Sequence, residues 1–157
     1  MQSNIPLAER LRPRTLDEYI GQEHLVGPQG VFRKFIETGN VPSFILWGPP
    51  GVGKTTLAKL VATVLERKLF TLSAVTSGVK EVREVIEQAR KSQFFNTPSP
   101  FLFIDEIHRF NKSQQDSLLG AVEQGVVTLI GATTENPSFE VISPLLSRCQ
   151  VYVLKAM

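Results

Sequence analysis

One segment of this sequence has the residue types and spacing of a loop that binds phosphate. Residues 48–55, Gly-Pro-Pro-Gly-Val-Gly-Lys-Thr, match the pattern G-x-x-x-x-G-K-[ST] at every fixed position. Glycines let backbone N–H groups turn inward around phosphate oxygens, and a following helix adds the positive end of its dipole. Lys54 can then reach the β- and γ-phosphates of a nucleotide, and the Thr55 hydroxyl can bind Mg²⁺. The alternative, a Gly/Pro turn before a helix, does not account for the complete motif between a buried strand and a helix.

Two adjacent acidic residues supply the carboxylates that phosphoryl chemistry needs. Asp105 ends the apolar run 101–105, and Glu106 follows it directly. Because ligands bind beyond the carboxyl ends of parallel strands, Asp105 is expected to hold Mg²⁺ opposite Thr55, often through a water. Glu106 is expected to orient and deprotonate the attacking water, a role that a kinase-like protein has no need of there. An exposed acidic turn is the alternative.

Polar residues later in the chain can complete the same site. A hydroxyl of Thr133 or Thr134, or the amide of Asn136, can reach the attacking water or the γ-phosphate; a polar turn before Pro137 is the alternative. Arg148 lies between an apolar helical turn and the next predicted strand. An arginine there can stabilise transition-state charge, including on the ATP of a neighbouring subunit.

Short apolar runs separated by amphipathic segments predict the elements that position these residues. The predicted strands are residues 44–47, 69–73, 101–105, 126–131 and 151–154. The predicted helices are residues 28–38, 54–65, 79–91, 111–124 and 144–147. Asn111 with Gln114 three residues later is typical of a capped helix start. Strands alternating with helices predict an α/β domain in which helices cover both faces of a parallel sheet.

Length and composition exclude several classes of protein. The 157 residues are 42% hydrophobic and 20% charged, which predicts one globular domain rather than a disordered or collagen-like chain. One cysteine, Cys149, excludes an internal disulfide and a multi-cysteine metal site. The longest nearly uncharged apolar stretch, 125–134, is too short for a bilayer, and the N-terminus lacks the apolar core of a signal peptide. We therefore expect a soluble cytoplasmic chain without a membrane partner.

These motifs together resemble the AAA+ ATPases, specifically the clamp-loader-like clade, over essentially the whole chain. The segments that carry this resemblance are LRP (11–13), YIGQ (19–22), GPPGVGKTT (48–56), FLFIDEIH (101–108), GATTENP (131–137) and LLSRC (145–149). Within that clade, residues 73–84, 105–116 and 130–140 are similar to the family of replication-associated recombination protein A. The eukaryotic relative of that family is the Werner-helicase-interacting protein.

The resemblance implies a fold and a set of site residues. The fold is a three-layer P-loop NTPase with a five-stranded parallel sheet, in which the strand ending at Asp105 is not adjacent to the strand before the phosphate loop. The implied ligands are ATP or ADP with Mg²⁺, bound between subunits, with Thr134 as a sensor of the γ-phosphate and Arg148 as an arginine finger acting in trans. With Leu11, Arg12 and Ile20 bordering the adenine, the expected nucleotide-binding residues are Leu11, Arg12, Ile20, Gly48, Pro49, Pro50, Gly51, Val52, Gly53, Lys54, Thr55 and Thr56. The expected catalytic residues are Glu106, Lys54, Thr134 and Arg148, and the expected metal ligands are Thr55 and Asp105.

The resemblance also implies an activity: DNA-dependent ATP hydrolysis by a nucleoid-associated homo-oligomer at stalled or damaged replication forks, in contact with single-stranded-DNA-binding protein. The formal net charge of +2 is too small to indicate nucleic-acid binding by itself. Basic residues on the predicted helix 79–91 and near the start of the next predicted helix suit sequence-independent phosphate contacts, with a solvated amphipathic face as the alternative. These residues are Lys80, Arg83, Arg90, Lys91, Arg109 and Lys112.

Members of this family continue with a helical lid and an oligomerisation region, so we interpret the chain as an N-terminal fragment. It is expected to form one domain, in which residues 1–40 are the adenine-side segment and 41–157 the α/β core. Alone it is expected to bind ATP with little or no turnover. The alternative functions are a clamp-loader subunit or Holliday-junction branch-migration motor, and a nucleotide-gated assembly module. A small-molecule kinase fits poorly, because no arginine-bearing lid segment is evident.

Overall fold

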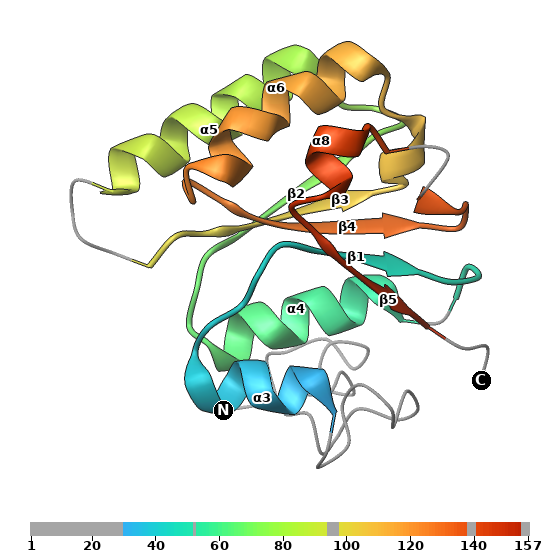
Figure 1. Ribbon diagram of the computed structural model, residues 1–157. Helices are drawn as coiled ribbons and strands as arrows, with labels where there is room; N and C mark the ends of the chain where they lie inside the picture. Colours follow the sequence, from blue (N-terminus) through green and yellow to red (C-terminus); the bar gives the residue numbers. More distant parts are fainter. Residues whose placement is uncertain (1–29, 52, 94–97, 138–140, 155–157) are drawn as a thin grey trace, which may run out of the picture.

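The computed structural model describes residues 30–51, 53–93, 98–137 and 141–154, which form three layers with a sheet in the middle (Figure 1). The strands are β1 (Phe44–Trp47), β2 (Leu69–Ser73), β3 (Phe101–Asp105), β4 (Thr128–Thr133) and β5 (Gln150–Val153). The helices are α3 (Val31–Thr38), α4 (Lys54–Val64), α5 (Val79–Gln93), α6 (Lys112–Glu123), α8 (Ser143–Leu146) and the short 3₁₀ turn η3 (Ile107–Arg109). The α/β class expected from the alternation of strands and helices is confirmed.

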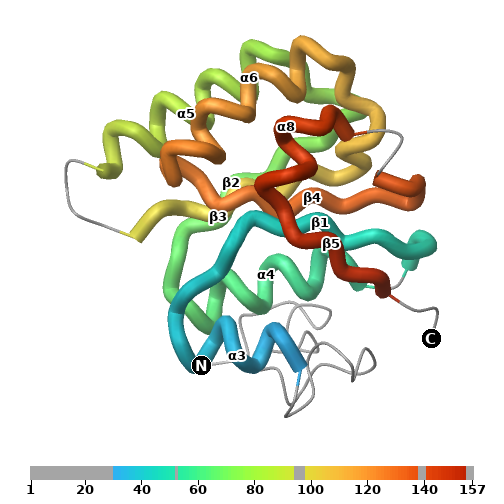
Figure 2. Tube along the Cα trace, viewed as in Figure 1, coloured from blue at the N-terminus to red at the C-terminus, as the bar shows by residue number. Residues whose placement is uncertain are grey.

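All strand pairs of the sheet are parallel, and the strand order is β2-β3-β4-β1-β5. The strand that leads into the phosphate loop, β1, therefore lies between β4 and β5, as the trace in Figure 2 shows. The strand that ends at Asp105, β3, lies between β2 and β4. The expectation that these two strands are not neighbours is confirmed, since β4 separates them.

Each face of the sheet has its own apolar core, because both faces are covered by helices. On one face, α3 and α4 pack against side chains that include Phe44, Leu46 and Phe103. On the other face, α5, α6 and α8 pack against side chains that include Ile45 and Ile104. Consecutive residues of one strand point to opposite cores, which explains why the strands have apolar runs without alternation.

The longest described helix, α5, is amphipathic. It buries Val82, Val85 and Ala89 and leaves its charged side chains in solvent. One of the exposed pairs, Glu87 and Lys91, forms an i,i+4 ion pair at 3.7 Å. Within the described ranges, no helix is both long enough and apolar enough to cross a membrane.

Several element bounds differ from the sequence-based prediction by one or two residues, and the start of β4 is one of them. Strand β4 begins at Thr128 rather than at residue 126, because pairing with β3 starts where Thr128 meets Phe101. Val126 and Val127 are buried without belonging to the strand. The turn η3 was not predicted, because three residues are too few to show a helical pattern of apolar side chains. Its position depends instead on contacts with β4, which is distant in the sequence.

The end of α4 gives the first testable prediction. Glu66 follows the helix with φ +54°, and the N–H groups of Glu66 and Arg67 donate to the carbonyls of Thr63 and Ala62. This pattern is a Schellman cap, a position that favours glycine because an L side chain is strained there. We expect E66G to raise the free energy of unfolding by about 1 kcal/mol.

Urea denaturation followed by circular dichroism measures this change. The control is E87G, the same substitution inside α5, which should lower the free energy of unfolding by about 1 kcal/mol. A destabilised E66G would show that the left-handed conformation of Glu66 is not a source of strain.

Candidate active site

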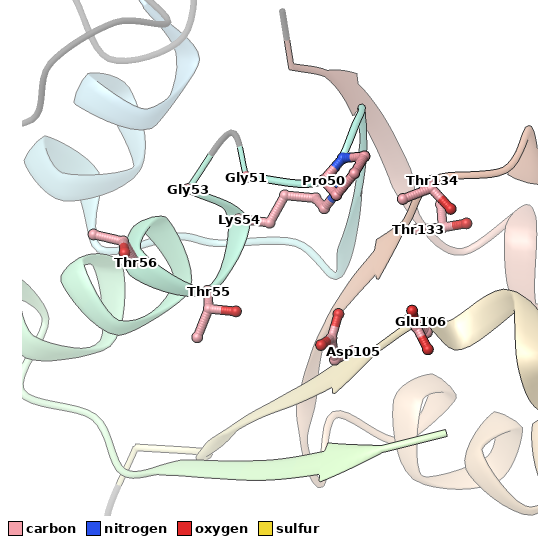
Figure 3. Close-up of a pocket in the computed structure, with 10 residues that line it drawn as sticks. All are labelled: Pro50, Gly51, Gly53, Lys54, Thr55, Thr56, Asp105, Glu106, Thr133 and Thr134. Atoms are coloured by element: carbon pink, nitrogen blue, oxygen red, sulfur yellow. The ribbon is translucent and has the colours of Figure 1, made fainter. Parts of the chain in front are cut away.

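The carboxyl ends of β1, β3 and β4 meet at one edge of the sheet and open into a cavity of about 420 Å³. Open α/β sheets bind ligands at this edge. Side chains reach the cavity from the loop after β1, from the start of α4 and from the ends of β3 and β4 (Figure 3). The lining residues are Pro50, Gly51, Gly53, Lys54, Thr55, Thr56, Asp105, Glu106, Thr133 and Thr134.

The loop between β1 and α4 has the backbone conformation of an anion-binding turn. Gly51 and Gly53 adopt φ +78° and +87°, the left-handed region in which glycine has no steric penalty. Gly53 is the N-cap of α4, and no side chain caps the helix there. The first turn of α4 therefore directs its amides and its positive dipole end at the cavity. Val52, also expected to bind nucleotide, lies outside the described residues.

Gly48 holds the start of this loop between two strands. Its N–H donates to the carbonyl of Thr133 at 3.1 Å. A Cβ at Gly48 would lie 2.7 Å from the carbonyl oxygen of Leu154, just after β5. Glycine is therefore required here by packing, whereas Gly51 and Gly53 are required by backbone conformation. The loop is anchored to β4 on one side and to β5 on the other.

Lys54 is buried at the centre of the site, with a relative exposure of 8%. Its Nζ donates to the carbonyls of Gly48 at 2.6 Å and Pro49 at 3.0 Å. Burial lowers the pKa of Lys54, and the nearby carboxylates of Asp105 and Glu106 act in the opposite direction. The ammonium is thus held by its own loop beside the cavity, where a phosphate would compete with the two carbonyls for it.

Thr55 and Asp105 can hold a divalent cation. They lie on opposite walls of the cavity, at the start of α4 and the end of β3 (Figure 3). A hydroxyl and a carboxylate are hard oxygen donors, which Mg²⁺ prefers. Among the described residues there is no cluster of three or more His, Cys, Asp or Glu side chains around a common point. The donor set therefore fits an ion that takes its remaining ligands from phosphate and water.

Glu106 has an unusual backbone conformation for its residue type. It adopts φ +54° and ψ +47° directly before η3, and its half-buried side chain lines the cavity beside Asp105. A non-glycine residue in this region is strained, and such strain clusters at functional sites. The conformation turns the chain sharply after β3, so two consecutive carboxylates reach the same cavity.

The two threonines at the end of β4 have different surroundings. Thr133 is 1% exposed, and its hydroxyl is bonded to His108 and to the backbone of Glu135. Thr134 is exposed and lines the cavity. The hydroxyl available to a ligand is therefore that of Thr134. Asn136, the third candidate, is not among the lining residues.

Arg148 does not reach the cavity of its own protomer. Its Nε lies 3.0 Å from a carboxylate oxygen of Glu123 at the end of α6, and its Nη1 donates to the carbonyl of Pro144 at 3.1 Å. The side chain remains 43% exposed. This placement leaves the guanidinium accessible to another molecule, and Arg148 is not among the residues that line the cavity. Burial raises the pKa of the neighbouring Cys149 thiol to about 12, so that thiol is inert at neutral pH.

Other expected site residues are only partly described. Leu11, Arg12 and Ile20, expected beside the adenine, lie outside the described residues. Every basic residue expected to contact DNA is exposed, on α5, in η3 or at the start of α6. Sequence reasoning did not assign a role to His108, although it lies in the segment FLFIDEIH. The sequence does show that His108 lies three residues after Asp105. That spacing is informative only once the structure places His108 beside Thr133, at the end of β4.

Comparison with known proteins identifies a family and several relatives. Residues 44–156 match the model described as "ATPase family associated with various cellular activities (AAA)". The chain is 55% identical over 152 residues to replication-associated recombination protein A of Escherichia coli strain K12, covering 97% of this chain and 34% of that protein. It is 51% identical to "ATPase WRNIP1" of Dictyostelium discoideum, covering 99% of this chain and 18% of that protein. The chain thus spans about a third or less of the length of these relatives.

Among solved structures, the chain resembles a protein titled the RuvB Holliday junction branch migration motor of Thermotoga maritima. The TM-score is 0.72 at 34% identity, over 93% of this chain and 48% of that one. The sequence identity to the recombination-protein relative is clearly higher than the identity to this motor.

Proposed function

We infer that this chain, which belongs to the AAA family of ATPases, is the N-terminal nucleotide-binding domain of a DNA-dependent ATPase in replication-fork maintenance, recombination and repair. Residues 1–40 would form its adenine-side segment and residues 41–157 its α/β core. The observation that carries the proposal is the cavity that brings Lys54, Thr55, Asp105 and Glu106 together at the carboxyl edge of the sheet. The similarity to replication-associated recombination protein A supports the DNA-linked part of it.

The proposed ligand is ATP, with ADP as the product. The amides of the loop and of the first turn of α4 would bind the phosphate oxygens. Lys54 would exchange the carbonyls of Gly48 and Pro49 for the β- and γ-phosphates. Thr55 and Asp105 would hold Mg²⁺, which when bound neutralises charge on the β- and γ-phosphates. Leu11, Arg12 and Ile20 would border the adenine.

Hydrolysis in this site would follow from the position of the polar side chains around the γ-phosphate. Glu106 would orient a water and accept its proton as the water oxygen attacks the γ-phosphorus and the bond to ADP breaks. The Thr134 hydroxyl would hold that water or a γ-phosphate oxygen. Because Arg148 lies away from the cavity of its own chain, it would act on the ATP of a neighbouring protomer. The active form would therefore be a homo-oligomer.

DNA would contact the exposed basic residues on α5, in η3 and at the start of α6. Such contacts are electrostatic and independent of sequence. We propose a fork or a junction of single- and double-stranded DNA as the substrate, single-stranded-DNA-binding protein as a partner, and a nucleoid-associated location in the cytoplasm. A branch-migration motor is the second candidate, supported by the structural similarity to RuvB.

A second testable prediction concerns ATP turnover with DNA. The protein at its natural length should hydrolyse ATP faster with forked DNA than without it. The stimulation should fall steeply between about 50 and 200 mM salt, as counterion release requires (about −0.9 in log–log slope per phosphate contact). A coupled assay with forked, single-stranded, duplex and four-way-junction DNA measures this. A preference for the four-way junction would favour the branch-migration motor. Equal rates with and without every DNA would remove the DNA-dependent part of the proposal.

A further inference from the structure

The turn η3 directly follows Glu106, and its first residue, Ile107, packs against β4. Ile107 is fully buried and packs over Gly131 of β4. A Cβ at Gly131 would lie 3.2 and 3.3 Å from two carbon atoms of Ile107, so a larger residue there would press against η3. The missing side chain of Gly131 lets the turn lie close to the strand.

A partly buried hydrogen bond forms the second attachment. Nδ1 of His108 lies 2.9 Å from Oγ1 of Thr133, the last residue of β4. The same oxygen accepts the N–H of Glu135 at 2.9 Å and donates to the carbonyl of Glu135 at 3.1 Å. A hydroxyl has one hydrogen to donate and two lone pairs, so the network is complete when His108 donates from Nδ1. With this assignment the Thr133 hydroxyl donates one hydrogen bond and accepts two, and it links the turn η3 to the end of β4.

These two attachments explain why Glu106 keeps a strained conformation. A non-glycine residue stays in the left-handed region only where its surroundings hold it there. Ile107 and His108 immediately follow Glu106, and Thr133 immediately precedes Thr134. The hydrogen bond from His108 to Thr133 therefore connects the backbone next to Glu106 with the backbone next to Thr134. The side chains of Glu106 and Thr134 both line the cavity.

We propose that His108 and Thr133 are positioning residues that fix the carboxylate of Glu106 relative to the hydroxyl of Thr134, and so orient the attacking water. This inference rests on the proposed ATP hydrolysis at this site. His108 is not among the residues that line the cavity, and the hydroxyl of Thr133, which is, is already bonded to His108 and Glu135. Both residues would act on the turnover rate by fixing the positions of Glu106 and Thr134, while nucleotide affinity depends on the phosphate loop.

The test compares four variants in the protein at its natural length. T133V and H108A remove the bond, whereas T133S keeps the hydroxyl and H108N keeps a polar nitrogen or oxygen near the position of Nδ1. We expect T133V and H108A to lower kcat roughly 10- to 100-fold with the Kd for ATP within about twofold of wild type. T133S and H108N should restore kcat to within about threefold. Single-turnover ATPase assays and a fluorescent-nucleotide titration give the two quantities.

A matched control lies at the other end of the same strand. Thr128 is also buried and accepts a hydrogen bond from Arg67 at 2.7 Å, so T128V makes the same chemical change to β4 far from the cavity. T128V should keep the wild-type kcat. A loss of kcat in T128V equal to that in T133V would reduce the effect to general destabilisation of β4 and overturn the inference.

The outcomes separate this inference from the proposed function. If E106Q abolishes turnover while T133V and H108A stay within twofold of wild type, the positioning role is wrong and the proposed function stands. If E106Q hydrolyses ATP as fast as wild type, or if the wild-type protein does not hydrolyse ATP at all, both fail. Because His108 is only half-buried, H108A should fold, so its kcat can be measured even if T133V does not fold.

Discussion

In the protein at its natural length, E106Q is expected to lower ATP turnover by about 10²- to 10⁴-fold, the usual contribution of a general base, while ATP binds with its Kd within about twofold of wild type. Glutamine has the shape of glutamate and cannot accept the proton of the attacking water. Affinity depends on the phosphate loop, Lys54 and the metal ligands, none of which this substitution changes. Rapid-quench measurement of ADP formation, with the Kd from calorimetry, separates the two effects.

The matched control for this prediction is E66Q. Glu66 and Glu106 are the two non-glycine residues with positive φ in the described part of the chain, so E66Q makes the same change at the same backbone conformation, at the far end of α4. E66Q should keep both turnover and affinity. If E106Q also kept more than about a tenth of wild-type turnover, Glu106 would not be a general base on the scale expected for one.

K54M should raise the Kd for Mg²⁺-ATP by about 100-fold or more, because charge-assisted hydrogen bonds to phosphate are worth about 1.5–3 kcal/mol each. Methionine fills a similar volume without the charge. K54M also removes the hydrogen bonds from Nζ to the carbonyls of Gly48 and Pro49, so the free energy of unfolding of the unliganded chain should fall by about 1–3 kcal/mol. The variant should therefore fold with reduced stability and lose its response to nucleotide.

A thermal-shift experiment on the 157-residue chain makes this loss visible. At a ligand concentration about 100 times the Kd, bound nucleotide stabilises the wild type by about 2.7 kcal/mol, and K54M should show almost none of this. The control is K59M, which removes a half-buried lysine on the same helix that does not line the cavity. Equal shifts in wild type and K54M would mean that the nucleotide binds elsewhere.

Most of the fold was predictable because its signals are local. Each strand is a short apolar run bounded by a turn, and the capping box at Asn111 and Gln114 is present with both hydrogen bonds. The phosphate loop was predictable for the same reason, since its glycines, lysine and threonine act within eight consecutive residues. The beginning of β4 was misplaced by two residues, because apolar character extends to Val126 whereas strand pairing starts at Thr128.

The parts of the site that were not predictable depend on contacts between distant residues. The residues alone left Thr133 and Thr134 as equal candidates. Both residues line the cavity, and the structure separates them because the Thr133 hydroxyl is bonded to His108 and Glu135, whereas Thr134 is exposed. The pairing of Arg148 with Glu123 joins residues in different elements, and nothing local in either segment indicates it.

A crystal structure of the chain with Mg²⁺ and a non-hydrolysable ATP analogue is the strictest test of nucleotide binding in this cavity. We expect phosphates inside the loop 48–55, with Nζ of Lys54 moved from the carbonyls of Gly48 and Pro49 to phosphate oxygens. We also expect Mg²⁺ between Thr55 and Asp105. A nucleotide bound outside this cavity, or a Lys54 still bonded to its own loop beside a bound triphosphate, would contradict this expectation.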